Sequence, residues 1–164
     1  MASCSIHESN NMEERRRPLK TEHQHRIEQF MKKAGQIVHK KPTIPGVKTR
    51  KLRAKLILEE AFETVKALGF NIIIDIGTGE LELVPNEDGC NIIEVADGCA
   101  DISVVTIGTL SAFGIHDKPL LEEVDDSNLR KFGTGSYKRS DGKWMKPADW
   151  TPPDIEKILK NISV

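Results

Sequence analysis

Glu59-Glu60-Ala-Phe-Glu63 and Glu94-Val-Ala-Asp97-Gly-Cys-Ala-Asp101 are two short acidic stretches, thirty residues apart, in otherwise apolar segments. Within each stretch the carboxylates recur at three or four positions, which places them on one face of an α-helix. Like charges at that spacing repel each other, and an apolar surround makes each charge more costly. The pattern therefore predicts two helices whose acidic faces share a cation.

The residues around the acidic stretches have helical periodicity. An apolar stripe from Leu52 to Leu68, followed by Gly69, predicts a helix over about 48–68. Asn91 is a suitable cap for the second acidic helix, which we expect over 91–113 with Cys99 as a core thiol. Between them, residues 71–76 and 80–84 flank a Gly-Thr-Gly turn and predict a β-hairpin that packs on the helices.

Residues 21–164 are expected to form one domain, preceded by a flexible polar arm over residues 1–20. A helix should begin at Thr21, where Thr21-x-x-Gln24 resembles a capping box, and its apolar residues continue to Val38 before the proline-containing loop 39–47. Further helices are predicted over 117–131 and 154–161. The segment 133–153 reads as an ordered surface loop.

Composition excludes several classes of protein. The chain has 38% hydrophobic and 30% charged residues and a formal net charge of -1, which gives no general attraction to nucleic acid or to acidic membranes. We identify no secretory signal and no stretch of the roughly 20 apolar residues that a membrane span needs. The three cysteines include no C-x-x-C pair, which predicts reduced thiols and a cytoplasmic location.

The expected cation is a hard metal ion, because every candidate ligand is a carboxylate oxygen. Magnesium fits this donor set, manganese is a possible substitute, and zinc does not fit. Either acidic stretch, taken alone, could instead consist of ordinary surface residues that bind no metal. Glu94 has a further alternative as the capping partner of Asn91, in which case Asp101 becomes the principal ligand on the second helix.

Basic residues follow the acidic helices along the chain. Six of them between Arg130 and Lys146 stand against the single acid Asp141, an excess that suits phosphate binding. The alternatives are a solvated basic loop or an RNA patch in which Tyr137 and Trp144 stack bases. Arg53 precedes Glu60 by seven residues, on nearly the same helix face, so it is a candidate for a phosphate contact or for a salt bridge.

Together these motifs resemble the MazG-like branch of the all-α nucleoside triphosphate pyrophosphohydrolase superfamily, whose signature is E-E-x-x-E on one helix and E-x-x-D on the next. The resemblance extends to Phe30-Met-Lys-Lys-Ala-Gly35, to Asp126-Ser-Asn128-Leu-Arg-Lys131 and to Asp141-Gly-Lys143-Trp-Met-Lys146-Pro. It implies a mainly all-α fold, a four- to five-helix bundle with a short β-hairpin between the two metal-binding helices. It also implies metal-dependent cleavage between the α and β phosphates of a nucleoside triphosphate.

Carried over by motif, the resemblance assigns roles to individual residues. Glu59 positions or deprotonates the attacking water. The metal is held by Glu60, Glu63, Glu94 and Asp97, with Asp101 as a further ligand or a supporting acid. Phosphate is bound by Asn128, Lys131, Lys143 and Arg53. The resemblance also implies a homodimer or a dimer of dimers, and no nucleic-acid partner is expected.

The gap between Glu63 and Glu94 is longer than in compact members of this branch, so substrate choice is open. Our leading hypothesis is hydrolysis of (d)NTPs to (d)NMP and pyrophosphate. The alternatives are a phosphoribosyl-ATP pyrophosphohydrolase and a non-catalytic nucleotide or metal sensor on the same scaffold.

Overall fold

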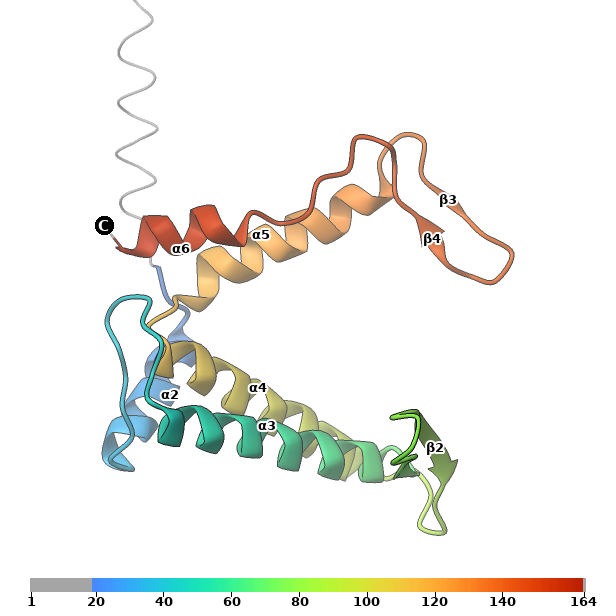
Figure 1. The fold of residues 1–164 in the computed structure, drawn as a ribbon, viewed down its shortest axis with the longest axis horizontal. Helices are drawn as coiled ribbons and strands as arrows, with labels where there is room; N and C mark the ends of the chain where they lie inside the picture. Colours follow the sequence, from blue (N-terminus) through green and yellow to red (C-terminus); the bar gives the residue numbers. More distant parts are fainter. Residues whose placement is uncertain (1–18, 164) are drawn as a thin grey trace, which may run out of the picture. The chain divides into compact units, whose positions relative to one another are not determined.

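The structure is a computed structural model that describes residues 19–163. Within that range the chain forms five α-helices, one 3-10 helix and two small β-hairpins, so the predicted mainly α-helical fold is confirmed (Figure 1). The predicted arm over residues 1–20 lies almost wholly outside the described residues, as does Cys4. In chain order the elements are α2 (Glu22–Lys33), α3 (Val47–Ala67), β1 (Phe70–Ile74), β2 (Leu81–Pro85), α4 (Ile92–Ala112), α5 (Asp117–Leu129), η1 (Arg130–Phe132), β3 (Tyr137–Lys138), β4 (Trp144–Met145) and α6 (Ile155–Ser163).

The described residues group into two compact units. One unit comprises Arg26–Ile115, and the other combines the described residues up to His25 with the segment from His116 onward. The first unit contains most of α2, both acidic helices and the first hairpin. The second contains the first turn of α2 and every element from α5 to α6.

The unit of residues 26–115 has a small core between α2 and the C-terminal half of α4. Ile27, Met31, Ile107 and Ala112 are buried there, with Phe113 packed against them. The loop after α2 returns along the end of α4, where the Thr43 backbone N–H donates to the Phe113 carbonyl at 2.9 Å. This arrangement fixes one end of α4, while α3 lies along its side (Figure 1).

The first described helix is shorter than its apolar pattern predicts. We expected periodicity to continue to Val38, but α2 ends at Lys33. The reason is Gly35, which has a φ of 68°, and the Gln36 backbone N–H then bonds back to the Met31 carbonyl at 2.8 Å. A glycine in the left-handed region closes the helix and overrides the apolar residues that follow it.

The predicted hairpin between the acidic helices is present. Strands β1 and β2 are antiparallel, with Phe70 opposite Pro85 and Ile74 opposite Leu81. Asp75 closes the turn by accepting the backbone N–H groups of Gly77 at 2.8 Å and Thr78 at 2.7 Å. Most hairpin side chains are exposed, so packing on the helices covers only part of its apolar surface.

The second unit joins the starts of two helices through a buried carboxylate. Asp117 is 1% exposed and accepts hydrogen bonds from the Thr21 hydroxyl and, at 2.9 Å, from the Thr21 backbone N–H. Thr21 caps α2 as predicted, because its hydroxyl oxygen accepts the Gln24 backbone N–H at 3.1 Å. The Gln24 side-chain oxygen accepts the Asp117 backbone N–H at 2.9 Å, so the two helix starts exchange hydrogen bonds in both directions.

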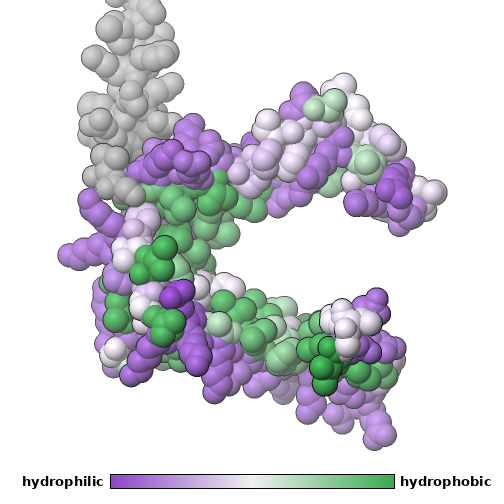
Figure 2. All heavy atoms as spheres, in the orientation of Figure 1, coloured by the Kyte–Doolittle hydropathy of each residue, from purple (hydrophilic) through white to green (hydrophobic). Residues whose placement is uncertain are grey.

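The N-terminal half of α4 is apolar but uncovered, which corrects one prediction. Cys99 was expected in the core and is exposed. Ile92 and Ile93 are 81% and 75% exposed, and Figure 2 shows apolar side chains gathered along this unit. The core contacts only the C-terminal half of α4, so burial of the helix stops before Cys99.

Among residues 19–163 no single helix is long and apolar enough to cross a membrane. Taken together, α4 and the segment from Asp117 to Phe132 have the length and apolar composition of a membrane span, but the chain is bent between them.

Candidate functional site

The two acidic helices come into close contact at Thr64 and Gly98. Thr64 is 6% exposed, and its hydroxyl donates to the Glu60 carbonyl at 2.7 Å. A Cβ atom added to Gly98 would lie 3.1 Å from Thr64 Cβ and 3.2 Å from Thr64 Cα. The absent side chain therefore allows close contact between α3 and α4, next to Glu60 and Asp97.

This close contact gathers negative charge around Glu60. Partial burial, followed by the charges of Asp101, Glu63, Glu59 and Asp97, raises the pKa of Glu60 above its ordinary value. Four carboxylates from two helices thus act on a fifth. The predicted pairing of the two acidic faces is present in the fold.

Glu94 shares a pocket with Glu63 but not with the other four acids. It lines a separate pocket of about 490 Å³ together with Glu63 and Lys66, and it is not among the charges that raise the pKa of Glu60. Its carboxylate does not cap the helix. Asn91 is the cap, and its own backbone N–H donates to the Ala67 carbonyl at 2.9 Å, leaving nothing for Glu94 to accept.

The donor set fits a hard divalent ion, although the side chains do not converge on one point. Among residues 19–163 no three His, Cys, Asp or Glu side chains meet closely enough to hold a metal as they stand. The side chains of Glu63, Asp97 and Asp101 are exposed. All are oxygen donors with excess negative charge, which is the chemistry that magnesium or manganese requires.

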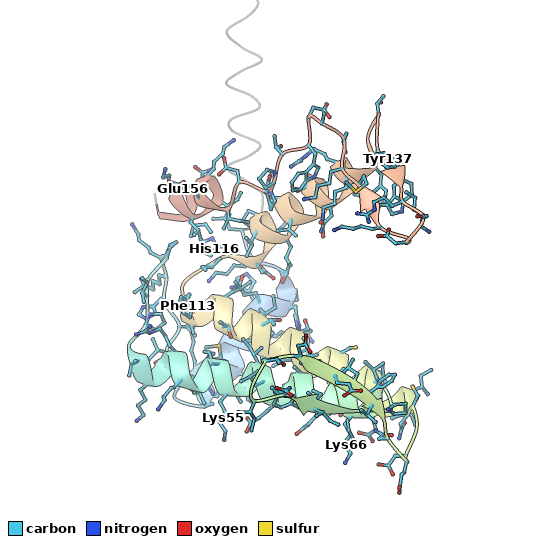
Figure 3. The ribbon with its side chains drawn as sticks, turned by 45° about the vertical axis from the view of Figure 1, so that its right-hand side comes forward. Lys55, Lys66, Phe113, His116, Tyr137 and Glu156 are labelled. Carbon is cyan, nitrogen blue, oxygen red and sulfur yellow. The ribbon has the colours of Figure 1, made fainter. Side chains whose placement is uncertain are left out.

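Glu59 lies beside this cluster and has a basic neighbour. Its carboxylate forms an ion pair with Lys55 at 3.1 Å, one turn earlier on α3. Figure 3 shows Lys55 and Lys66 on this same helix. Both partners of the ion pair are exposed, so solvent screens it and the carboxylate remains available to a water molecule.

A cavity of about 230 Å³ adjoins Glu60 and Asp101. Arg53 lines it and is 5% exposed, so its predicted position on the face of Glu60 is correct. Its guanidinium donates to the Gln36 side-chain oxygen, and burial lowers the pKa of Arg53. Sequence reasoning missed Gln36, whose only signal is its place after the helix-ending Gly35.

The predicted phosphate-binding residues of the other unit form two groups. Lys131 donates to the Asn128 side-chain oxygen at 2.6 Å and lies 5.8 Å from the centre of the Trp150 ring. Lys146, to which we assigned no role, lies 3.5 Å from that centre. Lys143 is exposed in the turn between β3 and β4, where its carbonyl accepts the Arg139 backbone N–H at 2.8 Å, and Figure 3 shows Tyr137 on the same hairpin.

A mainly helical fold with carboxylates of two adjacent helices gathered around Glu60 defines a class of protein, the all-α nucleotide pyrophosphatases. The chain belongs to the phosphoribosyl-ATP pyrophosphohydrolase family, whose model matches residues 27–128, more than half of the 164 residues. It is therefore a hydrolase that acts on acid anhydrides. This family and the MazG-like branch share one superfamily, and membership of that branch itself stays a prediction. No curated protein matches the chain.

Proposed function

We propose that this protein cleaves the bond between the α and β phosphates of a nucleoside triphosphate group, with a divalent metal ion, and releases pyrophosphate. The observation that supports this best is the gathering of four carboxylates around Glu60 at the contact of α3 and α4. Such a field requires positive charge, and a magnesium ion bound by a few carboxylates keeps coordination sites for substrate phosphates.

In this proposal Glu60, Glu63, Asp97 and Asp101 hold the metal, and Glu94 contributes from its neighbouring pocket. When bound, the ion supplies charge stabilisation to the phosphates and acidifies a coordinated water. Glu59 accepts the proton of the attacking water, and its ion pair with Lys55 orients the carboxylate. No side chain needs to form a covalent intermediate.

Phosphate oxygens are proposed to bind Asn128, Lys131 and Lys143. Lys131 and Asn128 are already oriented by their mutual hydrogen bond, which lowers the entropy lost when a phosphate binds. The aromatic ring of Trp150 holds Lys131 and Lys146 on its surface. Neutralising a leaving pyrophosphate requires several such donors.

Phosphoribosyl-ATP is the first candidate substrate, because it fits the family better than general triphosphate hydrolysis. The (d)NTPs are the second. They are supported by the basic segment from Arg130 to Lys146, which lies beyond the end of the family match at residue 128 and carries motifs that resemble the MazG-like branch. Both substrates present the same triphosphate to the metal.

The direct test is an assay of pyrophosphate and nucleoside monophosphate release from phosphoribosyl-ATP and from a panel of (d)NTPs, with magnesium, manganese or chelator. We expect turnover that needs metal, with Glu60→Gln and Glu63→Gln at least a hundredfold slower than the parent. Glu87→Gln, an exposed carboxylate in the loop after β2, is the matched control. Tight binding of nucleotide and metal without any product would instead identify a sensor.

We also propose that the chain forms a homodimer, or a dimer of dimers, in the cytoplasm and without a nucleic-acid partner. The support is the apolar surface that the unit of residues 26–115 leaves uncovered on both acidic helices, including Phe62 at 46% and Ile93 at 75% exposure. Light scattering should give at least twice the mass of one chain. Ile93→Glu should lower that mass, whereas Ile76→Glu, at the fully exposed hairpin tip, should not.

A further inference from the structure

The hairpin between the acidic helices leaves much of its apolar surface uncovered. It projects from the end of α3 that lies farthest from α2, and the core of this unit includes none of its residues (Figure 1). One face of the hairpin carries five large apolar side chains and no charge: Phe70, Ile72, Ile74, Leu81 and Leu83. Ile74 is 55% exposed and Leu81 is 59% exposed. Two strands alone are marginally stable in water, so a further strand would stabilise this hairpin.

The backbone of β1 has an open edge. At one end of the ladder the Asp75 N–H donates to the Glu80 carbonyl at 2.9 Å. At the other end the Asn86 N–H donates to the Gly69 carbonyl at 2.8 Å. Hydrogen-bonded pairs alternate along an antiparallel ladder, so the odd-numbered residues of β1 bond to β2 and the even-numbered residues direct their N–H and C=O groups away from it. Within residues 19–163 no backbone group of another element bonds to these outward groups, which belong to Phe70, Ile72 and Ile74.

The two outer edges of the hairpin differ in their protection. In β2, Pro85 occupies an outward-facing position without an N–H group, and Glu82 adds a charge that repels a second copy of the same strand. Strand β1 reads Phe-Asn-Ile-Ile-Ile and carries neither a charge nor a proline. Charges and prolines are the usual protections of an exposed edge, so the β1 edge alone is suited to pair with another strand.

We propose that β1 pairs with β1 of a second copy of this chain, antiparallel and around a two-fold axis at Ile72, to form a continuous four-stranded sheet. The outward groups of β1 are symmetric about Ile72. Ile72 therefore meets Ile72 of the second copy, and Phe70 meets Ile74 in both directions. This register joins all the outward-facing residues at once and places uncharged, apolar side chains opposite one another. A surface that is complementary to itself in this way fits the two-fold symmetry of a homo-oligomer.

The size of this contact determines the assembly that it supports. At about 200 Å² for a large apolar side chain, the exposed parts of the uncharged face amount to roughly 400 Å² per copy. Stable interfaces bury about 800 Å² per partner, so one hairpin contact does not hold a dimer by itself. Two such contacts reinforce each other when each half is already a dimer, because the second then forms within one assembly. The hairpins therefore join dimers, formed through the helix surface around Ile93, into a dimer of dimers.

Light scattering tests this contact without any substrate. We expect the parent to have the mass of four chains and Ile72→Lys the mass of two, because two lysines would face each other across the axis. Leu83→Lys is the matched control. Leu83 lies directly opposite Ile72 on β2, on the same face but away from the open edge, so its variant should keep the mass of four chains. Circular dichroism checks that both variants are folded.

A disulfide cross-link tests the register, in a background where serine replaces Cys4, Cys90 and Cys99. Ile72→Cys should link two copies under mild oxidation, because identical residues on the axis have Cα atoms about 5.5 Å apart. Ile73→Cys is equally close to the middle of the strand and should not link. Residue 73 of the second copy lies on the diagonal, about 7–8 Å away, which is beyond the usual reach of a disulfide.

An Ile72→Lys protein with the mass of the parent overturns the inference, and a parent of fewer than four chains overturns the joining of dimers. A Leu83→Lys protein that dissociates as fully as Ile72→Lys also overturns it, because the face and not the edge would then form the contact. Should Ile72→Lys not fold, the cross-link decides, and equal linking of Ile72→Cys and Ile73→Cys, or no linking of either, refutes the pairing. None of these measurements depends on turnover, so the contact and the proposed hydrolase activity stand or fall separately.

Discussion

Gly98→Ala tests whether the close contact of α3 and α4 builds the acidic site. The added Cβ would lie 3.1 Å from Thr64 Cβ and 3.2 Å from Thr64 Cα, and closer still to the Thr64 hydroxyl, which is held by the Glu60 carbonyl. Rotation of one side chain cannot relieve contacts with Cα and Cβ, so the helices must move apart by a few tenths of an ångström. Overpacking of this kind costs about 1–3 kcal/mol.

The expected magnitude includes an opposing effect. Alanine favours a helix over glycine by about 1 kcal/mol, so the net loss of stability should be about 1 kcal/mol, or about 2–4 °C in the unfolding midpoint. Ala54→Gly, at an exposed position within α3, measures that propensity difference alone. Separation of the carboxylates by a few tenths of an ångström should weaken metal-dependent turnover by about threefold to tenfold.

The assay is thermal unfolding in chelator, followed by circular dichroism, for Gly98→Ala, Thr64→Ala and the double variant. Thr64→Ala removes the hydroxyl that the new methyl group meets, so the double variant should be at least about 0.5 kcal/mol more stable than the sum of the single effects. The reasoning is refuted if Gly98→Ala is more stable than the parent, or if the two substitutions are simply additive.

Three further predictions concern other features of the structure. Glu60→Gln should raise the stability of the metal-free protein at pH 7. Because the pKa of Glu60 is raised in the folded state, the protonated carboxyl stabilises the parent fully below the ordinary pKa of 4.5, and this stabilisation is lost as the pH rises through the folded pKa. Unfolding midpoints measured across pH in chelator should therefore converge for the two proteins in acid. Asn91→Ala should cost about 1 kcal/mol in the same melts by removing the cap of α4, whereas Asn91→Asp should retain most of it. Asp117→Ala should cost about 1.5–3 kcal/mol and accelerate hydrogen exchange at the Thr21 amide, and unchanged exchange there would contradict the assigned contact.

Much of the site was predictable because charge spacing on a helix is a local property. The three- and four-residue repeats placed Glu60 and Glu63 on one face of α3, and Asp97 and Asp101 on one face of α4, before any contact between the helices was known. The hairpin was predictable from its turn residues for the same reason. The end of α2 was not, because a single left-handed Gly35 outweighed the apolar pattern that continued to Val38.

The sequence by itself determined the helices, the acidic faces and the preference for a hard metal ion, since periodicity and side-chain chemistry do not depend on distant contacts. Only the tertiary structure decided which acids act on one another, because that depends on where Thr64 meets Gly98. It brought Asp101 into the field of Glu60 and left Glu94 in a neighbouring pocket, uninvolved in capping. It also buried Arg53 against Gln36, a partner seventeen residues away along the chain that no local pattern connects to it.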